Sequence, residues 1–251
     1  MKTFEIGIIG GTGGIGKWFS DFFTEEGYTV HVSGRRTGMD MKQMAKQCRV
    51  VIVSVPIGVT CDVIEQVGPY MKEESLLMDF TSLKEKPVQA MLQHSASEVI
   101  GCHPLFGPDI DSIDGHSIVF CPGKIKKWSN WPKYLFEKKG AQAIIMTPEN
   151  HDEMMAIIQG LNHFNTIMLE LALRDTGVDR SELKKYSTPI FDTKLGIIDK
   201  VCTTDPRLHA EILTLNPYLN SILDLYEKNM TDLKSLIKSG NTEGVMKLIK
   251  K

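Results

Sequence analysis

The sequence has no cysteine pattern that suggests a structural disulfide or a zinc site. Its five cysteines are scattered along 251 residues, and no two of them have the Cys-x-x-Cys spacing. An odd, unpaired set of this kind is typical of reduced thiols in a reducing compartment. Cys102 stands next to a histidine, but neighbouring side chains in an extended segment point in different directions. We therefore interpret Cys102 as a small buried apolar residue rather than a nucleophile.

The sequence also lacks a long apolar run and a strong charge of either sign. No apolar stretch approaches the roughly 18 residues of a membrane-spanning helix, and the amino terminus shows no signal-peptide pattern. The formal net charge is −2 at pH 7, so no basic surface indicates nucleic acid or an anionic membrane as a partner. We expect a cytoplasmic protein. Its hydrophobic fraction of 42% is ordinary for a globular chain and permits a sizeable core.

A glycine-rich segment follows the first predicted strand. Residues 6–9 are mainly apolar, and Gly11, Gly13 and Gly16 then form the pattern G-x-G-x-x-G ahead of a helical pattern. In a dinucleotide-binding turn the first glycine permits a tight turn, and the second lets a pyrophosphate approach the backbone. The third allows the helix to pack closely on the strand. We therefore predict dinucleotide binding by the residues of this turn, which are Gly11, Thr12, Gly13, Gly14, Ile15 and Gly16.

The end of the second predicted strand favours NADP over NAD. That strand covers residues 28–33, and Gly34, Arg35 and Arg36 follow it. NAD sites usually place an acidic residue here to accept hydrogen bonds from the ribose 2′-hydroxyl, and that residue is absent. Because a hydroxyl and guanidinium groups suit a 2′-phosphate, we expect Ser33, Arg35 and Arg36 to bind NADP, with NAD as the alternative. A solvated basic turn that binds no ligand is the other interpretation.

Strand and helix patterns alternate through the first half of the chain. Further strands are predicted within residues 49–57 and 75–79, and at residues 99–100, 117–120 and 143–146. This alternation predicts an α/β fold with a Rossmann-type, doubly wound and mostly parallel sheet. From Pro148 onward the pattern is helical. We therefore expect a dinucleotide-binding domain at 1–147 and an all-helical domain at 148–251, which binds substrate and buries surface in a homodimer.

The helical half contains an interruption and an amphipathic end. Asp205-Pro206 breaks one helical stretch, Asn216-Pro217 starts another, and residues 231–251 predict a lysine-rich amphipathic helix. We expect the methionines at 154, 155 and 168 to fill the core of this half.

His103 is the candidate catalytic residue. The apolar pair at residues 99–100 predicts the end of a strand, Gly101 breaks it, and His103 then lies on a loop with two prolines and a glycine. Such loops are where an open α/β sheet presents its chemistry, and histidine exchanges protons near neutral pH. The turns near Gly11, Ser82 and His103 all follow strand ends, so we expect them to meet in one crevice. A histidine that only caps its loop is the alternative.

Two further histidines lie in the helical half. His151 and His163 are 12 residues apart in the sequence. This spacing places them roughly 18 Å apart along an α-helix, so they cannot ligate one metal ion, and we predict no metal site. We interpret His151 and the adjacent Asp152 as a capping pair at a helix start. His163 has apolar neighbours, which by itself favours a buried core histidine over a ligand.

Several separated motifs together resemble the prephenate/arogenate dehydrogenase family. They are G-G-x-G-x-x-G at 10–16, D-x-x-S-x-K at 79–84, HPLFGPD at 103–109, H-D-x-x-M-x-x-I-Q-x-L-x-H-F at 151–164, S-x-P-I-F at 187–191 and D-P-x-L-x-A-x-I at 205–212. The resemblance covers nearly the whole chain and is closest to the dehydrogenase part of the bacterial bifunctional enzymes. No chorismate mutase segment precedes the first strand, so we do not expect that second activity.

The resemblance implies the oxidative decarboxylation of prephenate to 4-hydroxyphenylpyruvate in tyrosine biosynthesis, with hydride transfer to NAD(P). His103 matches the family's catalytic histidine, which takes the proton of the substrate hydroxyl. Ser82 matches a serine near that hydroxyl and the nicotinamide, and His163 matches a histidine on the substrate side. By counting back from Asp205, Lys200 stands where the family commonly has an arginine that binds the substrate carboxylate. Lysine keeps the charge but loses the bidentate fork.

Two other functions stay open at this point. The first is the dehydrogenation of arogenate, which bears an amino group where prephenate has a keto group. The second is a redox-sensing NADP-binding module that has lost catalysis, against which the intact motifs at 79–84 and 103–108 argue. The glycine-rich turn also resembles NADP oxidoreductases that use a deazaflavin, but those enzymes would not need Ser82, His103 and His163 together.

Overall fold

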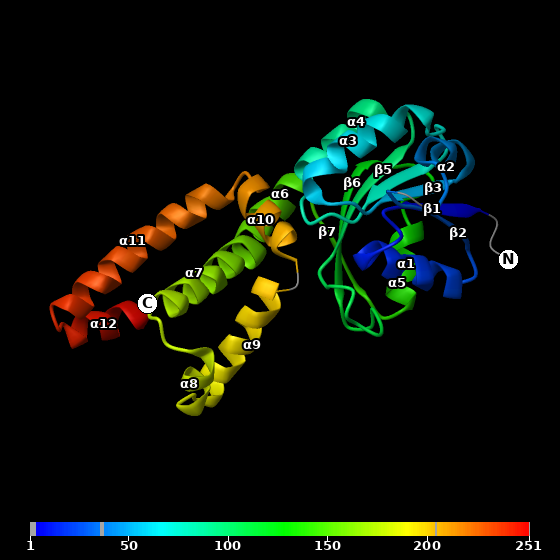
Figure 1. The fold of residues 1–251 in the computed structure, drawn as a ribbon. Helices are drawn as coiled ribbons and strands as arrows, with labels where there is room; N and C mark the ends of the chain where they lie inside the picture. Colours follow the sequence, from blue (N-terminus) through cyan, green and yellow to red (C-terminus); the bar gives the residue numbers. More distant parts are fainter. Residues whose placement is uncertain (1–3, 36–37, 204, 251) are drawn as a thin grey trace. The chain divides into compact units, whose positions relative to one another are not determined.

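The computed structural model describes residues 4–35, 38–203 and 205–250 (Figure 1). Their contacts divide the chain into two compact units, Met1–Asp152 and Glu153–Lys251. The predicted domain boundary precedes helix α6 (Pro148–Met155), whereas the division by contacts falls within that helix. No helix among the described residues combines the length and apolar character that crossing a bilayer requires.

The first unit is built on a seven-stranded sheet with the order β2-β1-β3-β4-β5-β6-β7. Its strands are β1 (Glu5–Ile9), β2 (Thr29–Ser33), β3 (Val50–Val53), β4 (Leu76–Asp79), β5 (Glu98–Pro104), β6 (Ser117–Lys124) and β7 (Gln142–Ile145). Every neighbouring pair is parallel except β5 and β6, which are antiparallel. The predicted Rossmann-type, mostly parallel sheet is therefore confirmed.

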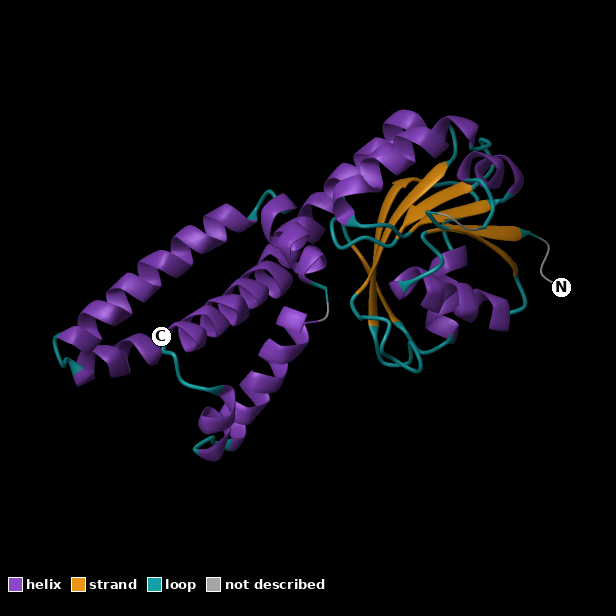
Figure 2. Cartoon of the chain, in the orientation of Figure 1, coloured by secondary structure: helices purple, strands orange, loops and turns teal. Residues whose placement is uncertain are grey.

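Helices cover both faces of this sheet (Figure 2). They are α1 (Gly14–Glu25), α2 (Met41–Gln47), α3 (Ile57–Val67), α4 (Glu85–His94) and α5 (Trp131–Lys138). Side chains of a strand alternate between the two faces, and the buried residues accordingly form two clusters. Phe19 of α1 and Phe136 of α5 belong to one cluster. Met44 of α2, Ile64 of α3 and Met91 of α4 belong to the other.

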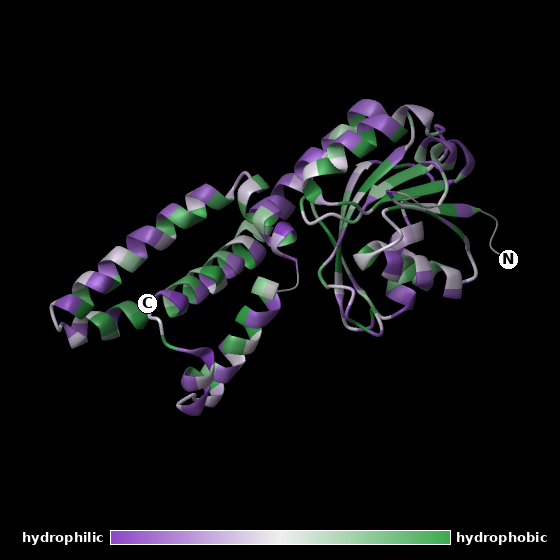
Figure 3. Cartoon of the chain, in the orientation of Figure 1, coloured by the Kyte–Doolittle hydropathy of each residue, from purple (hydrophilic) through white to green (hydrophobic). Residues whose placement is uncertain are grey.

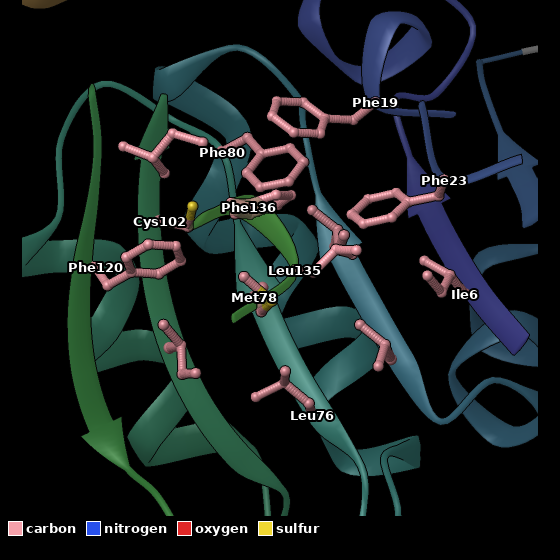
Figure 4. Packing of buried hydrophobic residues seen from close by; sticks show 14 of the residues in the cluster. Ile6, Phe19, Phe23, Leu76, Met78, Phe80, Cys102, Phe120, Leu135 and Phe136 are labelled. Atoms are coloured by element: carbon pink, nitrogen blue, oxygen red, sulfur yellow. The ribbon is translucent and has the colours of Figure 1, made fainter. Parts of the chain in front are cut away.

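The cluster that includes α1 and α5 is rich in aromatic rings (Figure 4). The ring centroids of Phe19 and Phe80 lie 4.3 Å apart. Trp18 donates a hydrogen bond from its indole nitrogen to the carbonyl oxygen of Ile110 at 2.8 Å, and its ring centroid lies 5.9 Å from that of Phe106. These contacts tie the connection between β5 and β6 to α1, so the segment that follows His103 is held against the core.

Strand β5 extends further than the sequence indicates. The prediction of a strand end at residues 99–100 and a loop from Gly101 is wrong, because β5 continues through Gly101 to Pro104. A Cβ atom at Gly101 would lie 2.6 Å from Cγ2 of Val88 in α4. This glycine therefore serves the close packing of α4 on the sheet rather than a turn. His103 lies within the strand, buried near its carboxyl end.

The second unit is helical, as predicted. After α6 the chain continues through the π-helical turn Ala156–Leu161, α7 (Asn162–Asp175), α8 (Arg180–Lys185), α9 (Pro189–Thr203), α10 (Pro206–Leu215), α11 (Leu219–Lys238) and α12 (Thr242–Ile249). Figure 3 shows polar and apolar residues alternating along α7 and α11, as in amphipathic helices. The predicted break at Asp205 is confirmed, because Asp205 caps α10 through its side chain.

Two details of the helical half differ from the predictions. The single helix predicted over residues 231–251 is wrong, because α11 already spans its first part and the chain then turns at Gly240, whose φ is +64°. Of the methionines expected in the core, Met155 is buried, but Met154 and Met168 are 45% and 42% exposed. Their side chains therefore cover the surface of this unit rather than fill its interior.

Candidate active site

The glycine-rich turn joins β1 to α1 through close backbone contacts. A Cβ atom at Gly16 would lie 2.5 Å from the carbonyl oxygen of Gly10, and one at Gly11 would lie 2.8 Å from Cγ1 of Val32. Gly10 is absent from the predicted site residues, yet its φ is +87° and a Cβ atom there would collide with the carbonyl oxygen of Ser54. The left-handed backbone that makes this turn tight therefore belongs to Gly10.

Gly13 differs from these glycines because nothing lies within 4 Å of the place where its Cβ would be. It stands at the amino end of α1, where no side chain of the described residues caps the helix. The first N–H groups of a helix and its dipole favour an anion at such a position. The space beside Gly13 and the backbone donors therefore fit the pyrophosphate of a dinucleotide.

The end of β2 lies beside this turn. Ser33 is buried, and its carbonyl oxygen accepts a hydrogen bond at 2.7 Å from a backbone N–H of the glycine-rich turn. A Cβ atom at Gly34 would lie 2.7 Å from the hydroxyl oxygen of Thr12, so the two turns pack directly on each other. Arg35 is exposed, and Arg36 lies outside the described residues. The residues predicted for the adenosine end of a dinucleotide thus adjoin those predicted for its pyrophosphate.

A buried ion pair holds the loop between β4 and α4. Asp79 ends β4, Lys84 precedes α4, and both side chains are fully buried. The ammonium group of Lys84 donates to Oδ2 of Asp79, and the same oxygen accepts from the backbone N–H and the hydroxyl of Thr81 at 3.0 and 2.5 Å. The other carboxylate oxygen, Oδ1, is buried with no hydrogen-bond partner among the described residues. Ser82 lies half-buried within this fixed loop.

A pair of buried histidines lies at the carboxyl end of β5. Nδ1 of His103 is 2.9 Å from Nε2 of His151, and Nδ1 of His151 is 2.7 Å from Oδ1 of Asp152. Asp152 also accepts hydrogen bonds from the backbone N–H groups of Lys84 and Glu85 at 2.7 and 2.9 Å. The interpretation of His151 and Asp152 as a cap of their own helix is therefore wrong. The carboxylate caps α4 instead, and the imidazole contacts His103.

Burial favours the neutral form of both imidazoles. Desolvation lowers the pKa of His103 well below 6.5, and the nearby His151 and Lys84 lower it further. Desolvation also lowers the pKa of His151, although the hydrogen bond to Asp152 opposes this shift. Burial raises the pKa of the Cys102 thiol, as expected for an inert apolar residue. A neutral His103 has a nitrogen that can accept a proton at pH 7, which is what a general base requires.

The second unit holds its own pair of histidines. His163 of α7 and His209 of α10 have ring centroids 4.4 Å apart. Burial lowers the pKa of His163 to about 4, with a smaller contribution from His209. The Nδ1 atoms of both rings are buried without a hydrogen-bond partner in the described part of the chain. Lys200 lies exposed on α9, which packs against α7. The substrate roles of His163 and Lys200 stay predictions.

Two family models match the chain. Residues 24–146 match the model described as prephenate dehydrogenase, nucleotide-binding domain. Residues 147–251 match the model described as prephenate dehydrogenase, dimerization domain. The chain belongs to the prephenate dehydrogenase family. The glycine-rich turn at 10–16 lies ahead of the matched residues, so its interpretation rests on the geometry above.

Other members of the prephenate dehydrogenase family are similar over nearly the whole chain. The "Probable arogenate/prephenate dehydrogenase" of Methanocaldococcus jannaschii is 35% identical over 264 residues, which cover 98% of this chain and 59% of that protein. A crystal structure of prephenate dehydrogenase from A. aeolicus with hydroxyphenyl propionate and NAD+ has a TM-score of 0.75 and 19% identity, covering 100% of this chain and 96% of that one. Synechocystis arogenate dehydrogenase has a TM-score of 0.75 and 18% identity, covering 98% and 96%. The chain spans about three fifths of the length of the curated relatives it matches.

The sequence reasoning did not assign site roles to His151, Asp152 and His209 in this member of the prephenate dehydrogenase family. His151 and Asp152 are adjacent in the sequence, which suggests a local cap, and only the fold shows that they reach β5 and α4. His209 falls within the D-P-x-L-x-A-x-I motif at 205–212, one turn into α10. Because Arg207 and Glu211, at the other variable positions of this motif, are also polar, the sequence carries no signal that distinguishes His209.

Proposed function

We propose that this chain catalyses the NADP-dependent oxidative decarboxylation of prephenate, with arogenate as the second candidate substrate. The observation that carries the proposal is the neutral, buried imidazole of His103 at the carboxyl end of β5. Strands β1, β3, β4 and β5 are parallel and in register, so their carboxyl ends share one edge of the sheet. The glycine-rich turn, the loop with Ser82 and His103 all belong to that edge, where open α/β sheets bind ligands.

The chain itself orients the substrate and the cofactor and transfers one proton. A nicotinamide dinucleotide supplies the hydride acceptor when bound. His103 takes the proton of the substrate's ring hydroxyl as the same carbon loses its hydride, and Ser82 donates or accepts a hydrogen bond at that hydroxyl. The Asp79–Lys84 pair supports Ser82 by fixing its loop. The oxidised ring then loses its carboxylate as carbon dioxide, and the gain of aromaticity drives this loss without a further protein group.

Replacement of His103 by Asn tests the assigned base. Turnover with prephenate should fall by about 10²–10⁴-fold, because the amide cannot take up a proton at neutral pH. The Kd of NADPH should stay within about twofold, since the predicted dinucleotide contacts lie at other strand ends. His94→Asn, at the end of α4, is the matched control and should keep full turnover. Wild-type turnover in His103→Asn would disprove the assignment.

NADP is the proposed cofactor, and NAD is the alternative. Ser33 adjoins the glycine-rich turn, Arg35 is exposed beyond it, and residues 33–36 contain no acid. The similar A. aeolicus structure contains NAD+. Replacement of Arg35 by Ala should weaken NADPH by about tenfold or more and leave NADH within about twofold, because only NADPH carries the 2′-phosphate. Equal losses of affinity for both cofactors in a fluorescence titration would contradict the preference.

His163 and Lys200 are the proposed substrate contacts of the helical unit. Prephenate and arogenate share the carboxylate that Lys200 would bind and differ in a keto or an amino group. Measuring reduced-nicotinamide absorbance with each substrate and each cofactor decides between them. Lys200→Ala should raise the KM of the preferred substrate about tenfold, and Lys200→Arg should restore it. Tight NADPH binding without turnover of either substrate would instead support the redox-sensing module.

We also propose that the chain forms a homodimer through its helical unit. The matching family description names a dimerization domain. Met230, Leu233 and Ile237 are spaced as one stripe along α11 and are 49%, 37% and 63% exposed. Contiguous exposed apolar residues of this kind mark interfaces. The predicted cytoplasmic location rests on the sequence alone.

A further inference from the structure

We infer that Asp152 and His151 fix the tautomer of His103, so that Nε2 of His103 is the nitrogen that takes the substrate proton. The inference rests on the proposed role of His103 as the base and adds two positioning residues to it. All three side chains belong to the first unit and are almost fully buried, so water does not compete for their hydrogen bonds.

The direction of these hydrogen bonds is set first at Asp152. Its Oδ1 accepts from the backbone N–H of Lys84 at 2.7 Å, and its Oδ2 accepts from the backbone N–H of Glu85 at 2.9 Å. Both oxygens therefore act as acceptors at the amino end of α4, where the helix dipole also favours a negative charge. Oδ1 lies 2.7 Å from Nδ1 of His151, so that nitrogen must carry the hydrogen. A bare Nδ1 would place two lone pairs against each other at this distance.

The donor and acceptor atoms of His151 then determine those of His103. Burial lowers the pKa of His151, and a neutral imidazole carries one N–H. With that hydrogen on Nδ1, Nε2 of His151 is an acceptor. It lies 2.9 Å from Nδ1 of His103, which must therefore donate. A neutral His103 with its hydrogen on Nδ1 has its basic lone pair on Nε2.

The arrangement also suits the protonated state that forms during turnover. When the substrate O–H bond breaks and an N–H bond forms at Nε2, the electron pair left on oxygen forms the new carbonyl as the hydride departs. The imidazolium of His103 then donates a charge-assisted hydrogen bond from Nδ1 to His151, and Asp152 lies beyond it as the counter-charge. The ammonium group of Lys84 opposes this cation.

Nuclear magnetic resonance of the imidazole nitrogens tests the inference without substrate. Full-length protein with ¹⁵N-labelled histidine is recorded at neutral pH, and the spectrum of His103→Asn identifies the signals of His103. We expect a protonated Nδ1 and a bare Nε2 at His103 in the wild-type chain. A protonated Nε2 would overturn the inference, and this result needs no variant of Asp152 or His151 to fold.

Replacement of Asp152 by Asn supplies the second arm. Oδ1 and Oδ2 each accept from one N–H group of α4, so a neutral amide can satisfy only one of these donors, and it removes the negative charge beyond His151 whichever way it lies. The imidazolium of His103 would then form without its counter-charge, so kcat should fall by about 10²–10⁴-fold with little change in KM. Glu153→Gln, at the exposed neighbouring position, is the control and should change neither the spectrum nor kcat. A folded Asp152→Asn protein with the wild-type kcat would overturn the inference.

The two arms separate this inference from the proposed function. If His103 has the expected tautomer but His103→Asn keeps full turnover, the role of His103 as the base fails and the tautomer assignment stands. If His103→Asn is inactive but wild-type Nε2 is protonated, the base stands and the positioning role of Asp152 and His151 fails.

Discussion

Lys84 is a charged side chain with no exposed surface, and its ammonium group pairs with the equally buried Asp79. Such a pair repays its desolvation only when both partners are present, because one buried charge left alone is strongly unfavourable. Thr81 provides two further hydrogen bonds to the same carboxylate oxygen. The pair therefore joins the end of β4 to the start of α4 and fixes the backbone around Ser82.

Replacement of Lys84 by Met should lower the free energy of unfolding by about 3–5 kcal/mol, because the Asp79 carboxylate would lose its counter-charge at a fully buried position. Lys86→Met changes an exposed lysine of the same helix and should stay within about 0.5 kcal/mol of the wild type. Urea unfolding followed by circular dichroism measures both. A Lys84→Met protein as stable as the control would show that the pair is not buried as described.

The lowered pKa of His103 predicts the acidic limb of the pH–rate profile. A base is lost when it is protonated, and burial lets His103 stay neutral below its usual pKa of 6.5. The fall of kcat/KM on acidification should therefore begin below pH 6.5 rather than at it. Steady-state rates are measured across the pH range to check this, and circular dichroism at each pH verifies that the protein stays folded. A limb centred at or above the usual histidine value would contradict the burial of His103.

At the scale of elements, the glycines of the glycine-rich turn have two different roles. One is required for folding, and another leaves room for a ligand, but the sequence pattern does not distinguish them. Gly10 is required by the fold, since its φ is +87° and a Cβ atom would collide with Ser54. Gly13 has an extended φ of −161° and open space around it, so alanine fits there without strain. Its methyl group would occupy the space assigned to the pyrophosphate.

Replacement of Gly13 by Ala should therefore leave the melting temperature nearly unchanged and raise the Kd of NADPH at least about tenfold. Gly10→Ala should instead lower the free energy of unfolding by more than about 1 kcal/mol. Thermal melting and a fluorescence titration of NADPH measure the two effects. If Gly13→Ala binds NADPH like the wild type, the dinucleotide does not contact this turn.

The sequence predicts the sheet well because its strands are short β-branched runs with a glycine or polar residue after them. The strand β3, for example, is Val-Val-Ile-Val and is buried along its whole length. The prediction failed at Gly101, because a glycine that makes room for Val88 in a neighbouring helix has the same local pattern as one that ends a strand. Gly240 shows the converse, since the helical periodicity continues past it although the chain turns there.

The candidate site is predictable only in part for the same reason. His103 and Ser82 are predicted as site residues because they stand in motifs near strand ends, and these roles stay predictions. The contact of His151 with His103 joins residues 48 positions apart, and no periodicity of either segment encodes it. The caps of Asp152 on Lys84 and Glu85 likewise depend on how α6 meets α4.

At the scale of the whole molecule, the buried histidines make stability depend on pH. Burial lowers the pKa of His103, His151, His163 and His209 in the folded chain. The unfolded chain takes up protons near the usual histidine value, whereas the folded chain does so only at lower pH. The stabilisation is therefore complete above 6.5 and is lost as the pH falls through 6.5 towards about 4, the pKa of folded His163.

The free energy of unfolding should consequently be lower at about pH 5 than at about pH 7.5, and His163→Gln should reduce this difference because one of the titrating groups is gone. Urea unfolding at both pH values for the two proteins measures it. The same dependence on pH in His163→Gln as in the wild type would show that His163 does not contribute.

The proposed dimer predicts the effect of a charge on α11. Leu233→Glu and Ile237→Glu together place two carboxylates in the apolar stripe with Met230, and burying unpaired charges in an interface is costly. The double variant should elute with the mass of one chain, 28.1 kDa, in size-exclusion chromatography with light scattering. Lys234→Glu lies between these positions on the exposed side of α11 and should leave the wild-type mass unchanged. Equal masses for all three proteins would rule out this face.

The aromatic cluster around α1 and α5 has a practical consequence for watching the molecule at work. The chain has three tryptophans, at positions 18, 128 and 131, and all of them lie in the first unit. Indole emission therefore reports on the dinucleotide-binding unit alone, while ellipticity at helical wavelengths reports on both. Because Trp18 holds the segment after His103 through Ile110, its emission is also a built-in sensor of any movement there.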